Sequence, residues 1–113
     1  MEHIVFIQEV KKDKKEEYLK YHKECPKELM EVIRDSGIKR EIIWLNGEQL
    51  IVYIMSDDFE KAMAGLVKQG VFKKWTSLME PLLSGMQDYS ENGKIKNLQK
   101  VFDLEEQLKA GSK

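Results

Sequence analysis

A dipeptide near the middle of the chain, Asn46-Gly47, limits the possible folds more than any other feature. It stands between two runs rich in β-branched and aromatic residues, within IKREIIWLNGEQLIVYIMS at residues 38–56. Asn-Gly favours the positive φ angles of a tight hairpin loop. The sequence therefore predicts two neighbouring antiparallel strands around this dipeptide.

Two further strands are predicted nearer the ends of the chain. HIVFIQEV, residues 3–10, is rich in β-branched and aromatic residue types, and NLQKVFDL, residues 97–104, also reads as a strand. SGMQDYSENGK, residues 84–94, is polar and contains glycine, so it is predicted to be a loop.

A helix is predicted between the first strand and the hairpin, beginning near Lys14. Asp13 and Glu16 have the spacing of a capping pair, and apolar residues then recur at helical intervals. Pro26 predicts a kink or break within this helix, and Gly37 predicts its end.

A second helical region is predicted after the hairpin. It begins near Asp57 and carries one apolar stripe as far as Val67. After Gly70 another apolar helical face includes Trp75, and Pro81 is predicted to bend its end.

The resulting order of elements is βαββαβ, which predicts an α+β, ferredoxin-like fold with an antiparallel four-stranded sheet and its helices on one face. The strand predicted after Asn46-Gly47 is apolar on both of its faces. Leu50, Val52 and Ile54 alternate with Ile51, Tyr53 and Met55. Because helices on one side cannot cover both faces, we expect a second copy of the chain to cover the other. The prediction is a homodimer built as a dimeric α/β barrel.

The totals narrow the class of protein and its partners. With 113 residues the chain has room for one domain, predicted at residues 1–105, followed by a flexible tail at residues 106–113. The 19 basic and 20 acidic residues leave a net charge of −1, which argues against nucleic acid as a partner. No apolar run reaches the length of a membrane span, so no membrane partner is expected and the cytoplasm is the expected location.

Cofactor and metal chemistry have no motif in this sequence. A single cysteine, Cys25, excludes an intrachain disulfide and a cysteine-rich zinc site. There is no glycine-rich phosphate loop, no HExxH and no paired carboxylates at metal-ligand spacing. We therefore expect no cofactor and no metal.

The residues best suited to chemistry are Tyr18 and His22, in EEYLKYHKECP at residues 16–26. Four residues make one helical turn, so both rings lie on the same helix face. An imidazole and a phenol offer two proton-transfer groups with very different pKa values. An ordinary pair of packed core side chains explains the same spacing, and spacing by itself favours that interpretation.

Three other side chains have two interpretations each. Trp75 packs in the core or stacks on a sugar ring, and Trp44 lies in the core or at an interface. Glu41 guards an edge strand or points a carboxylate into a pocket. Cys25 has no second histidine to activate it and is interpreted as a core residue.

Five segments together carry a resemblance to a known family. They are EEYLKYH, PKELMEVIRDSGI, WLNGEQLIVYIM, FKKWTSLM and LQKVFDL, which span nearly the whole chain. The chain resembles the L-rhamnose mutarotases and their close relatives assigned to L-fucose. The resemblance implies a dimeric ferredoxin-like α/β barrel and a monosaccharide substrate.

The resemblance also implies roles for particular residues. The family's tyrosine and histidine at Tyr18 and His22 lie in the sugar site, with the histidine as proton donor, and the tryptophan at Trp75 lines that site. Thr76 stands where rhamnose enzymes commonly carry a second tryptophan, and Glu41 stands where they carry a tyrosine. Trp75, Glu41 and Thr76 are thus the expected substrate-binding residues, beside catalytic His22 and Tyr18.

The predicted activity is an isomerisation, the exchange of α and β anomers of a 6-deoxy-hexose of the L-rhamnose or L-fucose type. Opening and closing a hemiacetal ring needs one acid and one base and no redox step. Dimeric α/β barrels also occur as small-ligand-binding modules and as cofactor-free monooxygenases, and fold by itself does not settle function. A structural dimer, in which Tyr18 and His22 only pack, is a third possibility.

Overall fold

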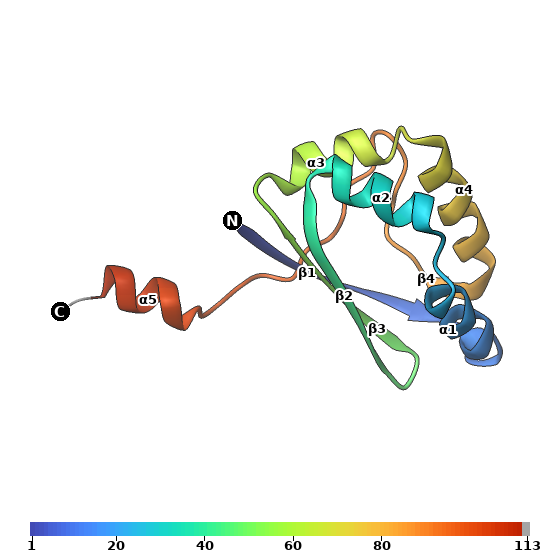
Figure 1. The fold of residues 1–113 in the computed structure, drawn as a ribbon. Coiled ribbons are helices and arrows are strands. Elements are labelled where there is room, and N and C mark those ends of the chain that lie inside the picture. Colours follow the sequence, from blue (N-terminus) through green and yellow to red (C-terminus); the bar gives the residue numbers. More distant parts are fainter. Residues whose placement is uncertain (112–113) are drawn as a thin grey trace.

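The computed structural model describes residues 1–111 and arranges them as a sheet with helices over one of its faces (Figure 1). The elements in chain order are β1 Glu2–Val10, a 3-10 turn Lys12–Lys14, α1 Lys15–Lys23, α2 Lys27–Ser36, β2 Ile38–Asn46, β3 Gln49–Ser56, α3 Phe59–Leu66, α4 Gly70–Met79, a 3-10 turn Glu80–Leu82, β4 Leu83–Gly85 and α5 Leu104–Ala110. The predicted α+β order is confirmed.

The sheet has four antiparallel strands in the order β2-β3-β1-β4. This is the predicted ferredoxin-like arrangement, in which the two halves of the chain interlock through the β1–β3 pair. β4 is short and pairs only with Glu9 and Val10 at the end of β1. Most of the outer edge of β1 and the whole outer edge of β2 therefore have no neighbouring strand within residues 1–111.

The hairpin predicted from Asn46-Gly47 is present, but its loop begins one residue later than the dipeptide suggests. Asn46 pairs with Gln49, so the loop residues are Gly47 and Glu48. Among the described residues only Gly47 and Gly37 have positive φ, with Gly47 at 65°. A positive φ at the first loop residue alone is the pattern of a type II′ turn.

The breaks in the first helical region follow the predictions at two points and differ at one. α1 ends at Lys23, and α2 begins directly after Pro26, whose ring suits a helix start. α2 ends at Gly37, with φ 116°. The capping pair is wrong, because Asp13 lies within the 3-10 turn and the residue before α1, Lys14, makes no side-chain cap.

The second helical region is also confirmed. The Asp58 carboxylate caps α3 by accepting a hydrogen bond of 3.1 Å from the Lys61 backbone N–H. α4 begins at Gly70, and Pro81 lies in the 3-10 turn that follows it.

The strand predicted at residues 97–104 is wrong, since the fourth strand is Leu83–Gly85. Within residues 1–111 one backbone hydrogen bond, from Leu98 N–H to the Val5 carbonyl at 2.7 Å, joins that segment to β1. Its apolar side chains are exposed, Val101 at 85% and Phe102 at 65%, so no core packing holds it as a strand. β4 is too short to show an alternating pattern in the sequence.

The helices bury one face of the sheet and leave the other uncovered. On the helix side Phe6, Val52 and Ile54 pack against Leu29 and Leu66 and are almost fully buried. The opposite side, which we call the far face, carries half-buried or exposed apolar side chains. These are Val5, Ile7, Ile42, Trp44, Ile51, Tyr53 and Met55. The strands are therefore apolar on both faces, as predicted.

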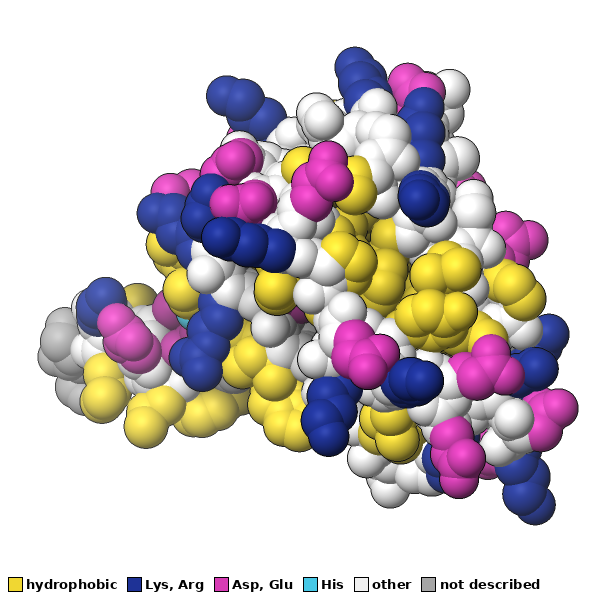
Figure 2. Space-filling view, turned by 45° about the vertical axis from the view of Figure 1, so that its right-hand side comes forward, with side chains coloured by type: hydrophobic (Ala, Val, Ile, Leu, Met, Phe, Trp, Pro, Cys, Tyr) yellow, Lys and Arg dark blue, Asp and Glu magenta, His cyan; other side chains and the backbone are white. Residues whose placement is uncertain are grey.

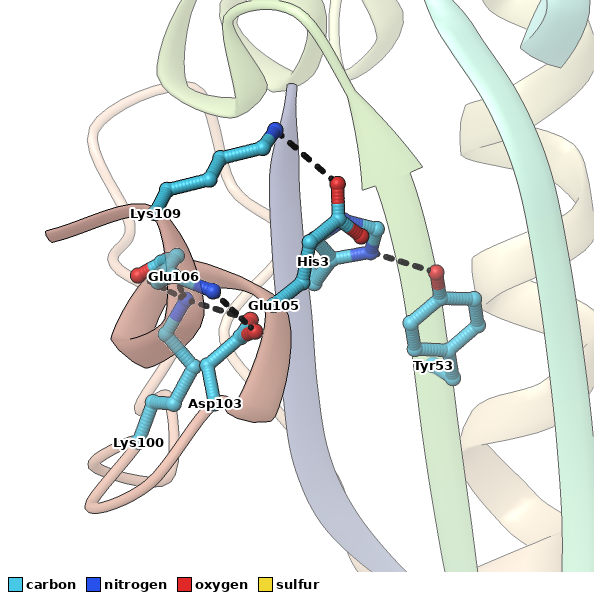
Figure 3. Close-up of polar contacts among 7 residues, drawn as sticks. All are labelled: His3, Tyr53, Lys100, Asp103, Glu105, Glu106 and Lys109. Atoms are coloured by element: carbon cyan, nitrogen blue, oxygen red, sulfur yellow. Dashed lines mark hydrogen bonds and ion pairs between the residues drawn. The ribbon is translucent and has the colours of Figure 1, made fainter. Parts of the chain in front are cut away.

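The C-terminal segment leaves the body of the molecule and ends in α5, which stands apart from the sheet (Figure 1). Asp103 caps α5, and the Lys100 amino group contacts Asp103 at 3.3 Å and Glu106 at 2.6 Å (Figure 3). The division into a domain at 1–105 and a flexible tail at 106–113 stays a prediction, and residues 112 and 113 lie outside the described residues. No helix within residues 1–111 combines the length and apolar character needed to span a membrane.

Candidate active site

α1 presents Tyr18 and His22 on one face, as their spacing predicts. The two ring centroids lie 4.0 Å apart, and Tyr18 is buried with 4% of its surface exposed. His22 is half-buried, because the end of α1 lies at the rim of the core. The pair therefore packs against the core on one side and borders a cavity on the other.

The hydrogen bond of His22 decides which ring nitrogen is free. Its Nδ1 lies 2.8 Å from the backbone carbonyl oxygen of Tyr18. A carbonyl only accepts hydrogen bonds, so Nδ1 carries the proton and donates it. In the neutral ring Nε2 then holds a lone pair, which can accept a proton from a ligand.

Trp75 on α4 forms the next wall of the site. Its ring meets the His22 ring edge-on, with centroids 5.2 Å apart and an interplanar angle of 73°. The Tyr21 ring also meets Trp75 edge-on, with centroids 6.4 Å apart. Trp75 is half-buried, so part of its ring surface remains open to a ligand.

A cavity between the sheet and the helices brings together the five residues predicted for the site. Its inner part holds about 70 Å³ and is lined by Tyr18, His22, Glu41, Trp75 and Thr76, among mostly apolar side chains. An adjoining pocket of about 380 Å³, which we call the outer part of the cavity, is also lined by His22, Glu41 and Trp75. Figure 2 brings the α1 and α4 side forward and shows hydrophobic side chains in a recess bordered by charged ones.

Glu41 enters this cavity from β2. It pairs with Ile54, whose side chain is buried on the helix side, and paired residues point to the same face. Crowding by the cavity walls raises the pKa of the Glu41 carboxyl to about 7, with no hydrogen bond or cation contributing among residues 1–111. Glu41 as a whole residue remains exposed, so it also meets solvent. β2 is an edge strand and Glu41 is exposed, so this position also fits the interpretation of Glu41 as an edge-guarding charge.

The environment moves the pKa values of Tyr18 and His22 in opposite directions. Burial, and then the nearby Glu41 carboxylate, raises the pKa of the Tyr18 phenol well above its usual value. Burial lowers the pKa of His22 below 6.5, and its hydrogen bond to the Tyr18 carbonyl partly offsets this. At neutral pH the phenol is protonated and the imidazole is mostly uncharged.

Two polar residues of the cavity are absent from the sequence-based predictions. Gln8 is buried on the helix side of β1, and its Oε1 accepts hydrogen bonds from the Tyr89 hydroxyl at 2.9 Å and the Gln87 backbone N–H at 3.0 Å. Gln8 interrupts an otherwise apolar strand face, which is a signal that sequence reasoning could have used. Tyr89 lies in a polar loop, where nothing in the sequence marks it.

Three remaining residues are also placed. The Thr76 hydroxyl donates to the Lys73 carbonyl at 3.0 Å, so its oxygen keeps an acceptor site toward the cavity. Cys25 packs against the core, and burial raises the pKa of its thiol, in keeping with its interpretation as a core residue. Trp44 lies on the far face, 52% exposed, and is not part of the core.

Fold and site together define a class: a ferredoxin-like α+β protein with proton-transfer groups in an aromatic-walled cavity between sheet and helices. Within residues 1–111, no three histidine, cysteine, aspartate or glutamate side chains are grouped as a metal site would require. The family model of L-rhamnose mutarotase matches residues 3–104. The chain belongs to this family, and with it to the isomerases that act on carbohydrate anomers.

Individual relatives agree with the family assignment. An L-rhamnose mutarotase of Shouchella clausii (strain KSM-K16) is 29% identical over 86 residues, which cover 74% of this chain and 82% of that protein. The crystal structure of an L-rhamnose mutarotase from Formosa agariphila superposes with a TM-score of 0.71 at 19% identity, covering 92% of this chain and 99% of the other.

A third similar protein is described as a dimeric ferredoxin-like protein from an uncultured marine organism. Its structure gives a TM-score of 0.53 at 14% identity, covering 89% of this chain and 95% of that one. At such identities the two structures establish the shared fold alone. The predicted ferredoxin-like fold is thus confirmed by topology and by these neighbours.

Proposed function

We propose that the protein exchanges the α and β anomers of a 6-deoxy-hexose of the L-rhamnose or L-fucose type, with His22 as a proton-transfer residue. The observation that carries the proposal is the position of His22, whose free Nε2 stands beside Tyr18 and Trp75 in one cavity. Membership of the mutarotase family supports the same reaction.

Anomer exchange requires the sugar ring to open and close again. A base removes the proton of the anomeric hydroxyl, and an acid protonates the ring oxygen as the bond from C1 to that oxygen breaks. Rotation about the C1–C2 bond then presents the other face of the aldehyde for closure. A well-placed group contributes about 10²–10⁴-fold to such a proton transfer.

The cavity suits a monosaccharide. Trp75 offers a ring surface for the apolar C–H face of a pyranose, and Tyr18 offers a protonated phenol as hydrogen-bond donor. Glu41 and Thr76 supply acceptor oxygens for sugar hydroxyls. The sugar would extend over both parts of the cavity, because the inner part, which Tyr18 and Thr76 line, holds only about 70 Å³.

The direct test is two-dimensional exchange NMR on the anomeric protons of L-rhamnose, L-fucose and other hexoses. We expect an exchange rate that rises in proportion to added protein and exceeds the spontaneous rate. The matching methyl glycosides are the control, because they lack the anomeric hydroxyl proton and cannot open. Thr76 and Glu41 replace aromatic residues of the rhamnose enzymes, so we expect faster exchange for L-fucose than for L-rhamnose.

Different results would exclude different parts of the proposal. Faster exchange with L-rhamnose than with every other sugar would contradict the expected preference for L-fucose. The proposed reaction, anomer exchange, would still stand. No catalysed exchange with any sugar would contradict the function itself. In that case a change in tryptophan fluorescence on adding sugar would favour a small-ligand-binding module.

A homodimer is the second part of the proposal. Exposure of the apolar far face of β1, β2 and β3 to water is unfavourable, and packing against the same face of a second copy would bury it. The similar marine protein is described as dimeric, which supports the idea. The cytoplasm stays the predicted location.

The C-terminal segment supports an assembly of two copies. Leu98, Val101, Phe102, Leu104 and Leu108 are all more than half exposed. Figure 2 shows the protruding end of the molecule with hydrophobic side chains on its surface. Such a row of exposed apolar side chains is unusual for an isolated chain, and a partner subunit would give it a surface to pack on.

A further inference from the structure

The starting observation is a carboxyl group in the cavity that forms no ion pair or hydrogen bond within residues 1–111. Glu41 lines both parts of the cavity, and its pKa shift has burial as its sole cause among the described residues. The nearest lysine along β2, Lys39, is engaged with Asp57 at 3.0 Å. A carboxyl that neither pairs with a cation nor accepts a protein hydrogen bond is available to a ligand.

The surroundings of Glu41 contain several titratable or charged groups on different elements. They are Tyr18 and His22 on α1, Cys25 after α1, Arg34 on α2, Lys39 and Arg40 on β2 itself, and Tyr89 in the loop after β4. Arg34 pairs with Asp35 at 3.0 Å. After burial, the charge of Glu41 is the next cause that raises the pKa values of Tyr18, Cys25 and Tyr89.

His22 and Glu41 reach the same cavity from two elements without contacting one another. Both line its inner and its outer part, yet neither contributes to the other's pKa shift and they form no ion pair within residues 1–111. Their ring nitrogens and carboxylate oxygens are therefore not in ion-pair contact, and a ligand that enters the cavity can meet both side chains. The hydrogen bond from Nδ1 to the Tyr18 carbonyl directs the His22 lone pair away from α1.

We infer that Glu41 and His22 are the acid and base of the ring-opening step, with the Glu41 carboxylic acid protonating the ring oxygen and His22 Nε2 accepting the anomeric hydroxyl proton. This inference rests on the proposed mutarotase function, and it assigns the acid role in ring opening to Glu41, whereas the resemblance implies His22 as proton donor. Both reacting oxygens are bonded to C1, so a base and an acid from two elements can act on them at once.

Each proton and electron pair in this step is accounted for. The O1–H bond breaks and its proton moves to Nε2, the O1 electrons form the C1=O1 double bond, and the C1–ring oxygen bond breaks. The ring oxygen takes the proton of the Glu41 carboxyl. After rotation about C1–C2 the Glu41 carboxylate recovers that proton, and imidazolium returns its own to O1 as the ring closes.

The protonation states needed are those that the surroundings favour. Burial lowers the pKa of His22 below 6.5, which keeps the base mostly neutral at pH 7, and raises that of Glu41 to about 7, which keeps about half of the acid protonated at that pH. Environments that push two pKa values apart in this way are typical of acid–base pairs. Tyr18, whose pKa is raised far above neutrality, stays a hydrogen-bond donor.

The pH dependence of kcat/KM follows from these states. The active form has neutral His22 and protonated Glu41, so the rate rises as pH increases through the pKa of His22, below 6.5, and falls as pH increases through about 7. Glu41→Gln keeps the size of the side chain and cannot release a proton. We expect it to lower the exchange rate by about 10²-fold and to remove the decline on the alkaline side.

Two further variants serve as controls for L-fucose and L-rhamnose exchange measured by NMR. Glu48→Gln removes the same charge in the hairpin loop, outside the cavity, and is expected to keep both rate and pH profile. Glu41→Asp keeps an acid with a shorter reach, so we expect a reduced rate that retains the alkaline decline. Loss of that decline in Glu41→Asp would contradict the role.

The outcomes separate this inference from the function on which it rests. Absence of exchange by the unmodified protein would overturn both. An active unmodified protein with a fully active Glu41→Gln variant would overturn the role of Glu41 alone. Nitrogen-15 NMR gives a direct readout of the base, and a His22 ring protonated on both nitrogens at pH 7 would also overturn the assignment.

Discussion

A single turn of α1 brings the rings of His22 and Tyr18 together, and other elements supply the side chains around them. The turn sets the 4.0 Å between their rings, and the Tyr18 carbonyl holds His22 Nδ1 at 2.8 Å. Trp75, 53 positions after His22 in the sequence, closes the site at 5.2 Å. The four-residue spacing of Tyr18 and His22 thus places both rings in the wall of one cavity.

Replacing His22 by asparagine tests proton transfer separately from packing. The Asn side-chain N–H can donate to the Tyr18 carbonyl in place of Nδ1, but an amide cannot take up a proton near neutral pH. We expect His22→Asn to keep the melting temperature near that of the parent and to lower anomer exchange by about 10²-fold or more. Calorimetry and exchange NMR on the same samples measure both.

Tyr18→Phe is the comparison for that experiment. It keeps the ring and removes only the hydroxyl, which burial keeps protonated. Loss of one hydrogen bond to a ligand corresponds to a rate decrease of about tenfold, smaller than that of His22→Asn. A His22→Asn protein as fast as the parent would make Tyr18 and His22 an ordinary packed pair.

Residue-scale features differed in how well the sequence revealed them. Tyr18, His22 and Trp75 were accessible through spacing and resemblance, and all three line the cavity. Glu41 was ambiguous, because a strand position does not state whether its face is closed by helices or meets solvent. Tyr89 was missed, since its contact with Gln8 joins residues 81 positions apart.

At the scale of elements, local signals placed most boundaries. Pro26 separates α1 from α2, Gly37 ends α2, and Gly47 opens the β2–β3 loop. Each of these residues restricts or releases φ within its own neighbourhood, so no distant contact is needed. β4 is the exception, because three residues become a strand only through pairing with the end of β1.

Gly37 allows a quantitative test at this scale. Its φ of 116° is unfavourable for any residue with a Cβ, and its carbonyl accepts a hydrogen bond from the buried Ser56 hydroxyl at 2.8 Å. An added Cβ would lie 3.5 Å from that of Ala62, an ordinary contact, so the cost is backbone strain. We expect Gly37→Ala to lower the free energy of unfolding by about 1–2 kcal/mol in urea titrations.

Gly65→Ala is the matched control within α3. Apart from its chain neighbours and its own helix backbone, no atom of residues 1–111 lies within 4 Å of an added Cβ there. Alanine is the better helix former, so stability should rise by about 0.5–1 kcal/mol. Equal effects of the two substitutions, measured at the same protein concentration, would refute the strain argument for Gly37.

At the scale of the whole molecule, the open question is what covers the far face. Trp44 projects from it with 52% of its surface exposed. If two far faces meet, Trp44→Lys buries an unpaired charge between them. We then expect the dissociation constant of the dimer to increase by about tenfold or more. Sedimentation equilibrium at micromolar concentration should give twice the chain mass for the parent and a lower average for the variant.

Leu78→Lys provides the control for that measurement. Leu78 is an exposed apolar residue of α4, 41% exposed, on the opposite side of the molecule from the far face. We expect this variant to sediment as the parent does. A parent protein that is monomeric throughout the micromolar range would contradict the homodimer.

The sequence by itself determined the hairpin, the helix ends and the apolar faces of the strands, because φ preferences and side-chain periodicity act over a few residues. Only the tertiary structure decided that Leu83–Gly85, and not residues 97–104, completes the sheet. It likewise decided that Glu41 shares a cavity with His22. Strand order and cavity walls depend on which distant surfaces pack together, and that choice is made by burial of the whole core.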